Sequence, residues 1–392
     1  MTTERDPKLP SSTPADGRAE SLNPGADEAG LLRAATDSTS RRAFLQRASL
    51  LTLTIPGVGA ALAACAPEGG GQAQGGAAAA GVQGAGHNPD SRLDTALHAP
   101  AEHSTGGVSG AGVQFHRYDP ALPPLSRSRT LKLHFVARHD AIAVADGLVV
   151  AGWTFEGDTP GPIVHCRVGD TVEFTLTNEA DVPHSMDFHA AQIDPKVAFR
   201  SVLRGQSVSY TFTPRYAGAF LYHCGTAPVL MHIGTGMYGA IIVEPRDPLP
   251  PARDFVLVEG ELYLGAAVNG VRPFDYSRML SSEPDMVVFN GRPDQYVREP
   301  LRAKVGERVR FWVVNAGPTL SCAFHVVGEQ FDTVYLGAPP GNAIHGVQTF
   351  AVPAGGGMPF ELQCDIPGEF VFVNHAFGHG QKGAIGMLVV EA

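Results

Sequence analysis

Val168–Phe174 (VGDTVEF) recurs in the second half of the chain as Val305–Phe311 (VGERVRF), and an asparagine, Asn178 or Asn315, follows each copy four residues later. In the first copy, apolar and polar residues alternate through residues 172–177, which is typical of a half-buried β-strand. A strand motif that occurs twice, with the same residue after it, predicts that a β-domain has been duplicated.

The elements that follow each copy also come in the same order. A histidine segment is first, then a glycine–aromatic strand that ends in His223 or His375, and then a closing strand, Gly239–Glu244 or Gly386–Glu391. From about residue 116, short β-branched runs are separated by Gly, Pro and Asp, and the chain has 46 Gly and 31 Pro. The sequence therefore predicts an all-β fold of two tandem Greek-key β-sandwich domains. The predicted domains are residues 113–247 and 248–392.

The N-terminal part has a different composition. An Arg-Arg pair precedes a mostly apolar run that ends in Leu62–Cys65 (LAAC). Residues 1–65 are therefore predicted to be a twin-arginine export signal with a lipoprotein-type cleavage box, which would leave the protein in the cell envelope with a lipid anchor at Cys65. Cleavage near Ala64 without a lipid is the open alternative. Residues 66–112, rich in Gly and Ala, are predicted to form a flexible tether.

Charge and cysteine content add two constraints. The formal net charge of −10 argues against a nucleic-acid partner. Besides Cys65 the chain has four cysteines, and Cys224 lies in a metal-binding pattern, so an odd number is left and no disulfide framework is indicated. We interpret Cys166, Cys322 and Cys364 as buried apolar residues, with a disulfide between two of them left open.

The segment Tyr222–Met237 (YHCGTAPVLMHIGTGM) places three metal-binding side chains on one loop. His232 comes eight residues after Cys224, and Met237 five residues after His232. With His184 from upstream, they form the His₂Cys set with a weak axial Met that is typical of a blue-copper electron-transfer site. Each residue by itself is more often a buried structural side chain, but the four together favour a metal site.

A second histidine set interleaves with the first. His184 and His189 are separated by an odd number of residues, so along a strand they face opposite sides. His223 and Cys224 are neighbours, and their Cα atoms are about 3.8 Å apart, which predicts a short covalent link between two metal sites. His375 ends the glycine–aromatic strand of the second copy, as His223 does in the first. It is therefore the predicted third imidazole of the second site.

These motifs resemble the copper-containing nitrite reductases, in particular a short-loop subgroup, over about residues 116–392. The resemblance implies cupredoxin-like domains, two coppers per chain and a homotrimer whose subunit interfaces hold the second copper. The implied type 1 copper ligands are His184, Cys224, His232 and Met237. The implied type 2 copper ligands are His189, His223 and His375 of the partner subunit.

The same resemblance implies the reaction and the residues that carry it. The activity would be dissimilatory, denitrifying reduction of nitrite to nitric oxide, with electrons from a small redox protein, a cytochrome c or another cupredoxin. Asp187 and His325 would be catalytic, and Thr349 would orient His325. The chain departs from many members in having one residue fewer between Cys224 and His232, no Gly-rich stretch after His189, and Gln330 in place of a further histidine.

Two other functions remain as alternatives to a nitrite reductase. A two-domain multicopper oxidase that reduces dioxygen needs His-x-His pairs, and the chain has none; its nearest approach is His375 with His379. A cupredoxin that only carries electrons has no use for a second copper site, so His189, His223 and His375 count against it.

Overall fold

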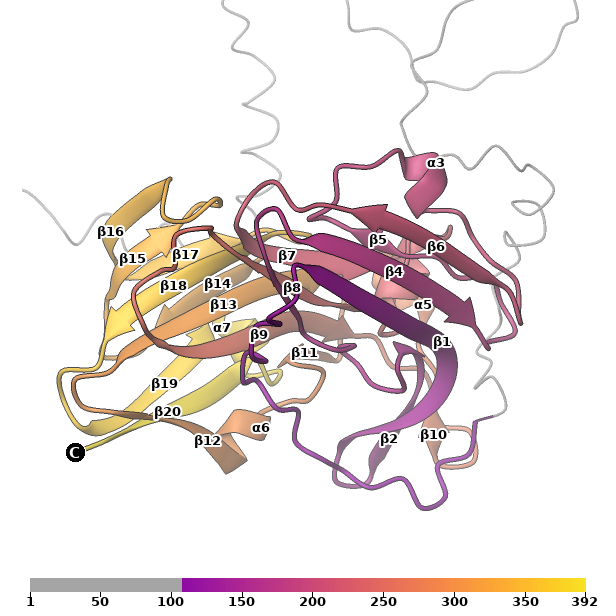
Figure 1. Ribbon diagram of the computed structural model, residues 1–392. Coiled ribbons are helices and arrows are strands. Elements are labelled where there is room, and N and C mark those ends of the chain that lie inside the picture. The colour runs from indigo at the N-terminus through magenta and orange to yellow at the C-terminus, as the bar shows by residue number, and fades with distance from the viewer. Residues whose placement is uncertain (1–107) are drawn as a thin grey trace, which may run out of the picture. The chain divides into compact units, whose positions relative to one another are not determined.

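The computed structural model describes residues 108–392 (Figure 1). The predicted export signal, the lipid-anchor cysteine Cys65 and nearly all of the predicted tether lie outside this range. Within it, no helix is both long enough and apolar enough to cross a membrane.

The first half of the described chain forms two sheets whose inner faces enclose one core. The five-stranded sheet has the order β10 (Val271–Arg272), β2 (Leu148–Phe155), β1 (Thr130–Ala145), β4 (Thr171–Asn178) and β6 (Ser207–Phe212). The four-stranded sheet has the order β3 (Val164–Arg167), β8 (Tyr238–Glu244), β7 (Gly218–His223) and β5 (Asp187–Phe188). The repeat motif gives β4, where Val172, Phe174 and Leu176 are buried as the alternation predicted.

The second half repeats this arrangement around its own core. Its six-stranded sheet has the order β11 (Met286–Phe289), β9 (Arg253–Leu262), β13 (Arg308–Gly317), β18 (Gly357–Gln363), β15 (Phe331–Tyr335) and β16 (Ala343–Val347). Its five-stranded sheet has the order β12 (Glu299–Lys304), β20 (Ile385–Glu391), β19 (Gly368–Asn374), β14 (Cys322–Val326) and β17 (Thr349–Val352).

The helices of the described chain are short and lie in the connections between strands. They are α3 (Pro195–Ala198), α4 (Val229–Gly234), α5 (Tyr276–Leu280), α6 (Gln295–Arg298) and α7 (Phe377–Gly380). The predicted all-β class is confirmed. The proposed domain boundary between residues 247 and 248 falls in the connection between β8 and β9 and stays a prediction.

Apolar and polar contacts join the two halves. A third hydrophobic cluster contains Leu221 and Ile242 from the first half and Val256 and Trp312 from the second. β10, from the second half, extends the sheet of the first half by pairing with β2.

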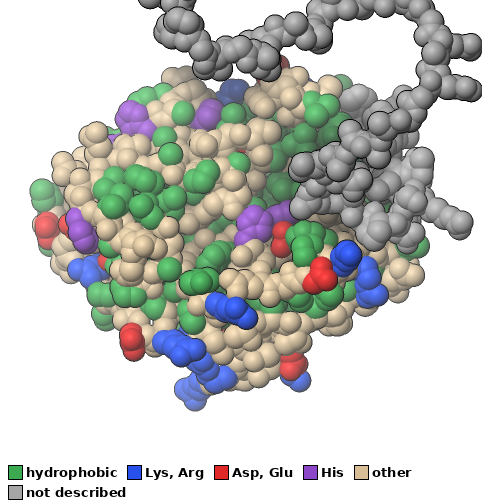
Figure 2. All heavy atoms as spheres, turned by 90° about the horizontal axis from the view of Figure 1, so that it is seen from above, with side chains coloured by type: hydrophobic (Ala, Val, Ile, Leu, Met, Phe, Trp, Pro, Cys, Tyr) green, Lys and Arg blue, Asp and Glu red, His purple; other side chains and the backbone are tan. Residues whose placement is uncertain are grey.

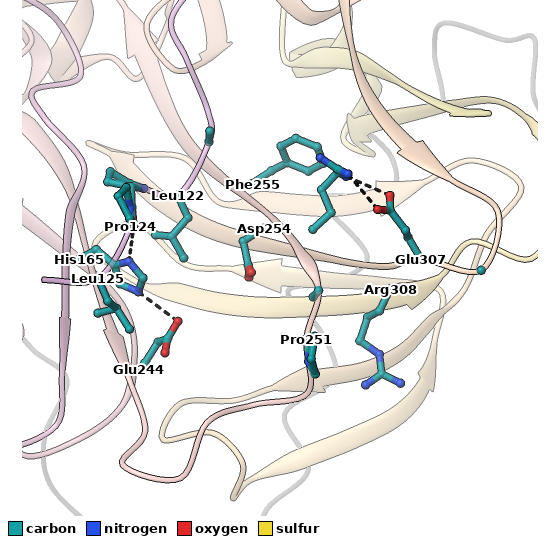
Figure 3. Close-up of a pocket in the computed structure, with 15 residues that line it drawn as sticks. Leu122, Pro124, Leu125, His165, Glu244, Pro251, Asp254, Phe255, Glu307 and Arg308 are labelled. Carbon is teal, nitrogen blue, oxygen red and sulfur yellow. Dashed lines mark hydrogen bonds and ion pairs between the residues drawn. The ribbon is translucent and has the colours of Figure 1, made fainter. Parts of the chain in front are cut away.

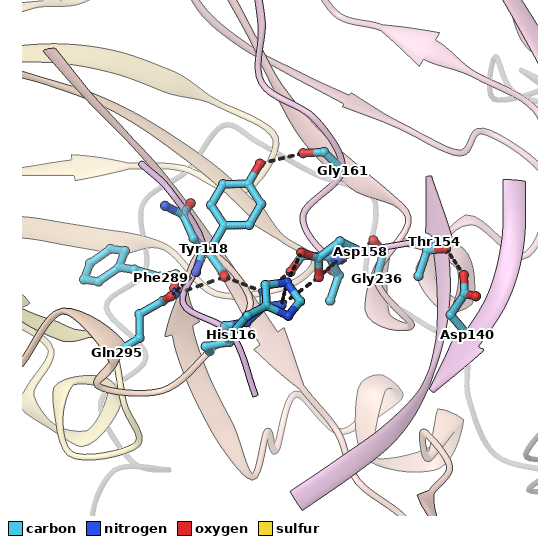
Figure 4. A network of polar contacts seen from close by, with 12 residues as sticks. His116, Tyr118, Asp140, Thr154, Asp158, Gly161, Gly236, Phe289 and Gln295 are labelled. Atoms are coloured by element: carbon cyan, nitrogen blue, oxygen red, sulfur yellow. Dashed lines mark hydrogen bonds and ion pairs between the residues drawn. The ribbon is translucent and has the colours of Figure 1, made fainter. Parts of the chain in front are cut away.

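A segment that precedes β1 bonds to both halves (Figure 4). His116 lies 3.0 Å from Asp158 of the first half, and the fully buried Arg292 of the second half lies 2.8 Å from the same carboxylate. Two residues further on, the Tyr118 hydroxyl donates to the carbonyl of Gly161 (2.8 Å), and the Tyr118 N–H donates to Gln295 (2.8 Å). These bonds therefore hold the segment before β1 against both β-sandwiches.

Strand register corrects the match between the two repeats. Tyr222 of β7 pairs with Gly239, and Phe372 of β19 pairs with Gly386; a Cβ on either glycine would collide with the ring opposite. Phe372 is therefore the counterpart of Tyr222.

The residues that follow Phe372 shift accordingly. Val373 is the counterpart of His223, and Asn374 is the counterpart of Cys224. The sequence match of His375 to His223 was wrong by two residues: His223 is the last residue of β7, whereas His375 lies just beyond the end of β19.

Candidate metal centres

Three side chains predicted to bind type 1 copper converge at the end of β7. Cys224 Sγ lies 3.1 Å from Nδ1 of His232 and 3.8 Å from Nδ1 of His184, and the two Nδ1 atoms are 3.2 Å apart. Cys224 follows β7 directly, His232 lies in α4, and His184 precedes β5. All three are buried.

The fourth predicted ligand, Met237, is attached to the same loop. Its N–H donates to the carbonyl of His232 (3.0 Å), and its carbonyl accepts from the N–H of Cys224 (3.1 Å). Met237 is fully buried and belongs to the same hydrophobic cluster as Cys224. The structure therefore brings the four predicted residues to one place.

Burial sets the protonation states in this cluster. It lowers the pKa of His184 to about 4 and that of His232 to about 3, so both imidazoles are neutral at neutral pH. Burial by itself raises the pKa of the Cys224 thiol, but hydrogen bonds from His184 and from the N–H of Ser185 bring it below its ordinary value. Neutral imidazoles and a readily deprotonated thiol are the forms that bind metal. A soft sulfur with two nitrogens in a dry site fits copper.

Three ring contacts around this cluster were not found from the sequence. The Trp153 ring lies 4.9 Å from that of His232 and 5.6 Å from that of His184. His139 stacks on Trp153 with the ring centroids 5.0 Å apart. These contacts cross from β1 and β2 to the loops, and no motif spacing marks them.

The second group of ligand atoms comes from Asp187, His189 and His223. The Nε2 atoms of the two histidines are 3.1 Å apart, and an oxygen of Asp187 lies 3.5 Å from Nε2 of His223 and 3.7 Å from Nε2 of His189. Asp187 and His223 face each other because they are register partners on β5 and β7.

Hydrogen bonds to backbone carbonyls orient both imidazoles of this group. Nδ1 of His189 lies 3.1 Å from the carbonyl of Gly355, and Nδ1 of His223 lies 2.9 Å from the carbonyl of Cys224. Since a carbonyl only accepts, Nδ1 carries the proton in each ring, and the lone pair on Nε2 is free for a metal. The two Nε2 atoms lie 3.1 Å apart, so the residues present fit a site for one metal ion.

Burial also shifts the pKa values of this group. It lowers the pKa of His223 to about 4 and lowers that of His189, although the Gly355 carbonyl opposes the change for His189. Burial raises the pKa of the Asp187 carboxyl to about 7. The His189 side chain is one-third exposed, so this group is open to solvent where the cysteine cluster is closed.

His325 and His375 lie together in the second half, with their ring centroids 5.2 Å apart. Within residues 108–392, neither imidazole joins the ligand group around Asp187. By register, His325 occupies in β14 the position that Asp187 has in β5. Thr349 is the register partner of His325, but Nδ1 of His325 bonds the carbonyl of the preceding residue, Gln348, at 2.5 Å.

Two features of the surface are drawn in Figures 2 and 3. Figure 2 shows a face on which histidine side chains reach the surface among hydrophobic and uncharged groups. A surface hollow of about 720 Å³ is lined by His165, Glu244, Arg253 and Glu307 among others, and no predicted metal ligand lines it (Figure 3). In this hollow, Nε2 of His165 lies 3.1 Å from a carboxylate oxygen of Glu244. Cys166, Cys322 and Cys364 are buried, as the sequence predicted, and so is Cys224. All four are free, so the disulfide that the sequence left open between two of the first three is absent.

Known proteins resemble the chain across this region. A sequence model of the multicopper oxidase family matches residues 137–248. The copper-containing nitrite reductase of Neisseria meningitidis serogroup A is 42% identical over 255 residues, which cover 63% of this chain and 66% of that protein. That of Cereibacter sphaeroides is 33% identical over 264 residues, covering 61% of this chain and 70% of that protein.

A solved structure resembles it as well. The copper nitrite reductase from Nitrosomonas europaea superposes with a TM-score of 0.63 at 38% identity, covering 67% of this chain and 94% of that one. The two β-sandwiches and the two ligand clusters place the chain in the class of two-domain copper proteins. Within that class, the chain belongs to the family of copper-containing nitrite reductases, as its motifs predicted. It spans 66%, slightly less than two thirds, of the meningococcal relative's length.

Proposed function

We propose that the protein is a copper-dependent dissimilatory nitrite reductase. The reaction consumes one electron and two protons: nitrite becomes nitric oxide and one oxygen leaves as water. One observation carries the proposal: a closed cysteine–histidine cluster and an open imidazole–carboxylate cluster are joined through the peptide bond between His223 and Cys224. An electron site and a substrate site placed so close together suit a one-electron reductase.

Two coppers per chain follow from the two donor sets. His184, Cys224, His232 and Met237 would hold the type 1 copper. His189 and His223, with His375 of the partner subunit, would hold the type 2 copper. When bound, copper supplies one-electron redox chemistry at the first set and a Lewis acid for nitrite at the second.

Two residues of the chain would then supply the protons. Asp187 points its carboxylate at the two Nε2 atoms, so it is placed to hold a proton beside an oxygen of bound nitrite. His325, held through Nδ1 by the Gln348 carbonyl, presents Nε2 as the second proton source. Asp187 and His325 lie at equivalent positions of the two halves. In the proposed homotrimer, the contact between the first half of one subunit and the second half of its neighbour would bring them together.

The position of His375 supports a homotrimer. His375 is exposed and lies with His325 rather than with the other two histidines of its own chain, so it would bind the copper of a partner subunit. A small redox protein would deliver the electron. Export to the cell envelope and a lipid anchor at Cys65 rest on the sequence of residues 1–65. No nucleic-acid partner is proposed for a chain with a net charge of −10.

Anaerobic production of nitric oxide from nitrite tests the proposal, on copper-loaded protein with a chemical reductant and the copper-to-protein ratio recorded. Nitric oxide at turnover with two coppers per chain is the expected result. Two coppers with oxygen consumption but no nitric oxide would indicate a multicopper oxidase instead. One copper without turnover would indicate an electron carrier.

A further inference from the structure

The second half keeps the frame of the cysteine cluster but holds different groups in it. In the first half, the N–H of Ser185 lies 3.3 Å from Cys224 Sγ; in the second, the N–H of Ala323 donates to Oδ1 of Asn374 at 3.1 Å. The helix that follows each strand supplies an imidazole in both halves. His232 lies 3.1 Å from Cys224 Sγ, and His379 lies 3.2 Å from Nδ2 of Asn374. An amide therefore stands where the first half has its thiol.

Asn374 ties together the segments that a metal would otherwise join. Its Oδ1 accepts from the N–H of Ala323 in β14 and from the N–H of Ala376 at the start of α7, each at 3.1 Å. Its Nδ2 lies 3.1 Å from both carboxylate oxygens of Glu259 in β9. The side chain is fully buried, so these bonds are made without competition from water.

Glu259 is a feature that this half alone possesses. It pairs in register with Asn315, whereas in the first half Ala137 pairs with Asn178, the counterpart of Asn315. A carboxyl that is 1% exposed is costly to bury unless hydrogen bonds satisfy it. The amide of Asn374 and the thiol of Cys322 do so.

His375 follows Asn374 directly, and its backbone is held on both sides. Its N–H donates to the carbonyl of Ala323 at 2.7 Å, and the next N–H, that of Ala376, is bound by Asn374. The imidazole itself is exposed and contacts the rings of His325 and Phe377. Its position thus depends on the backbone that Asn374 fixes.

We propose that Asn374, held by Glu259, is the positioning residue for His375, in the place that the copper-binding cysteine occupies in the first half. This inference rests on the proposed function, in which His375 completes the type 2 site of the partner subunit. An imidazole that must meet a metal held by another chain needs a fixed backbone, since a displacement of about 1 Å can cost about 100-fold in rate.

The test uses Asn374→Ala in the copper-loaded protein, with Asn315→Ala as matched control. Asn315 is also fully buried in the second half, and it makes bonds of the same kind to Leu320, Val352 and Gly317 at 2.8–3.0 Å. Four properties are measured: the affinity for type 2 copper, its electron paramagnetic resonance signal, the type 1 absorption and the unfolding midpoint. We expect Asn374→Ala to weaken type 2 copper binding at least about 10-fold with the type 1 absorption unchanged. Asn315→Ala should lower the unfolding midpoint by a similar amount and keep the type 2 copper.

His375→Ala separates this inference from the proposed function. If His375→Ala keeps the type 2 copper, the proposed ligand set is wrong. If His375→Ala loses it while Asn374→Ala binds it with unchanged affinity and signal, the positioning role is overturned. Equal losses in Asn374→Ala and Asn315→Ala would also overturn it, since the effect would then be general destabilisation.

Glu259→Ala decides the matter if Asn374→Ala does not fold. It removes the acceptor for the Asn374 amide and leaves Asn374 in place. A weakened type 2 signal with normal type 1 absorption supports the inference, and an unchanged type 2 signal overturns it.

Discussion

The end of β7 and the end of β19 are built on the same frame, but they are closed by different chemistry. At β7 a thiol and two imidazoles face each other at 3.1–3.8 Å in a dry site. At β19 an amide, a carboxyl and one imidazole form a chain of hydrogen bonds. The comparison shows that one backbone frame can hold either a set of candidate metal ligands or a network of hydrogen bonds.

The largest expected effect comes from removing the thiol. Cys224→Ser should abolish the type 1 absorption and lower nitrite turnover driven by a redox-protein donor by more than about 100-fold, because loss of a ligand exceeds the cost of losing a neighbour that orients one. Visible absorption and donor-driven nitric oxide production are the measurements.

Cys322→Ser is the matched control, since Cys322 is a fully buried thiol in the frame of the second half. It should leave absorption and copper content unchanged. A Cys224→Ser protein that kept its absorption would break the comparison.

The next effect concerns the equivalent positions Asp187 and His325. Asp187→Asn removes a proton donor but keeps the side-chain shape, so turnover should fall about 10²–10⁴-fold with the type 1 absorption retained. His325→Gln should lower turnover in the same direction. Steady-state nitrite reduction and absorption spectra check both variants. Joint loss of absorption and turnover in Asp187→Asn would mean that the carboxylate supports the fold instead.

The smallest effect is a dependence of stability on pH between pH 4.5 and pH 7 that comes from the buried carboxyl of the second frame. Burial raises the pKa of Glu259 to about 7 from an ordinary value of 4.5. The folded protein therefore keeps a proton that the unfolded chain releases. This contribution to stability is complete below pH 4.5 and is lost as pH rises towards 7, at no more than about 1.4 kcal/mol per pH unit.

Three groups face this carboxyl: Cys322 and Asn374 donate to it, and the charge of Glu261 opposes its ionisation. Glu259→Gln cannot ionise, so its unfolding midpoint should change less than that of the unsubstituted protein between pH 5 and pH 7.5, both metal-free. Parallel pH profiles for the two proteins would contradict the shifted pKa.

The sequence carried the parts of the site that are local in the chain. Cys224, His232 and Met237 lie on one loop, and the spacing of His184 and His189 separates two faces, so their grouping followed from strand periodicity. The repeat of VGDTVEF was sufficient for the all-β class. Residues 1–107 lie outside the described structure, so the export signal, the anchor and nearly all of the tether stay predictions.

What the sequence could not supply depends on contacts between distant elements. The position of Asn374 is set by the packing of Phe372 on Gly386, which no pattern of histidines reveals. Trp153 meets the histidine rings across separate strands and loops. The acceptor for His325 is the backbone carbonyl of Gln348. Every residue has such a carbonyl, so the sequence cannot show which one accepts.

The segment with His116 and Tyr118, which precedes β1, is bonded to both β-sandwiches. The segment is held by His116, which bonds Asp158 and Arg292, and by the two Tyr118 hydrogen bonds. These bonds reach both halves, and every predicted copper ligand lies further along the chain. We therefore expect a pull on the N-terminal side to break these contacts before it disturbs the predicted metal ligands.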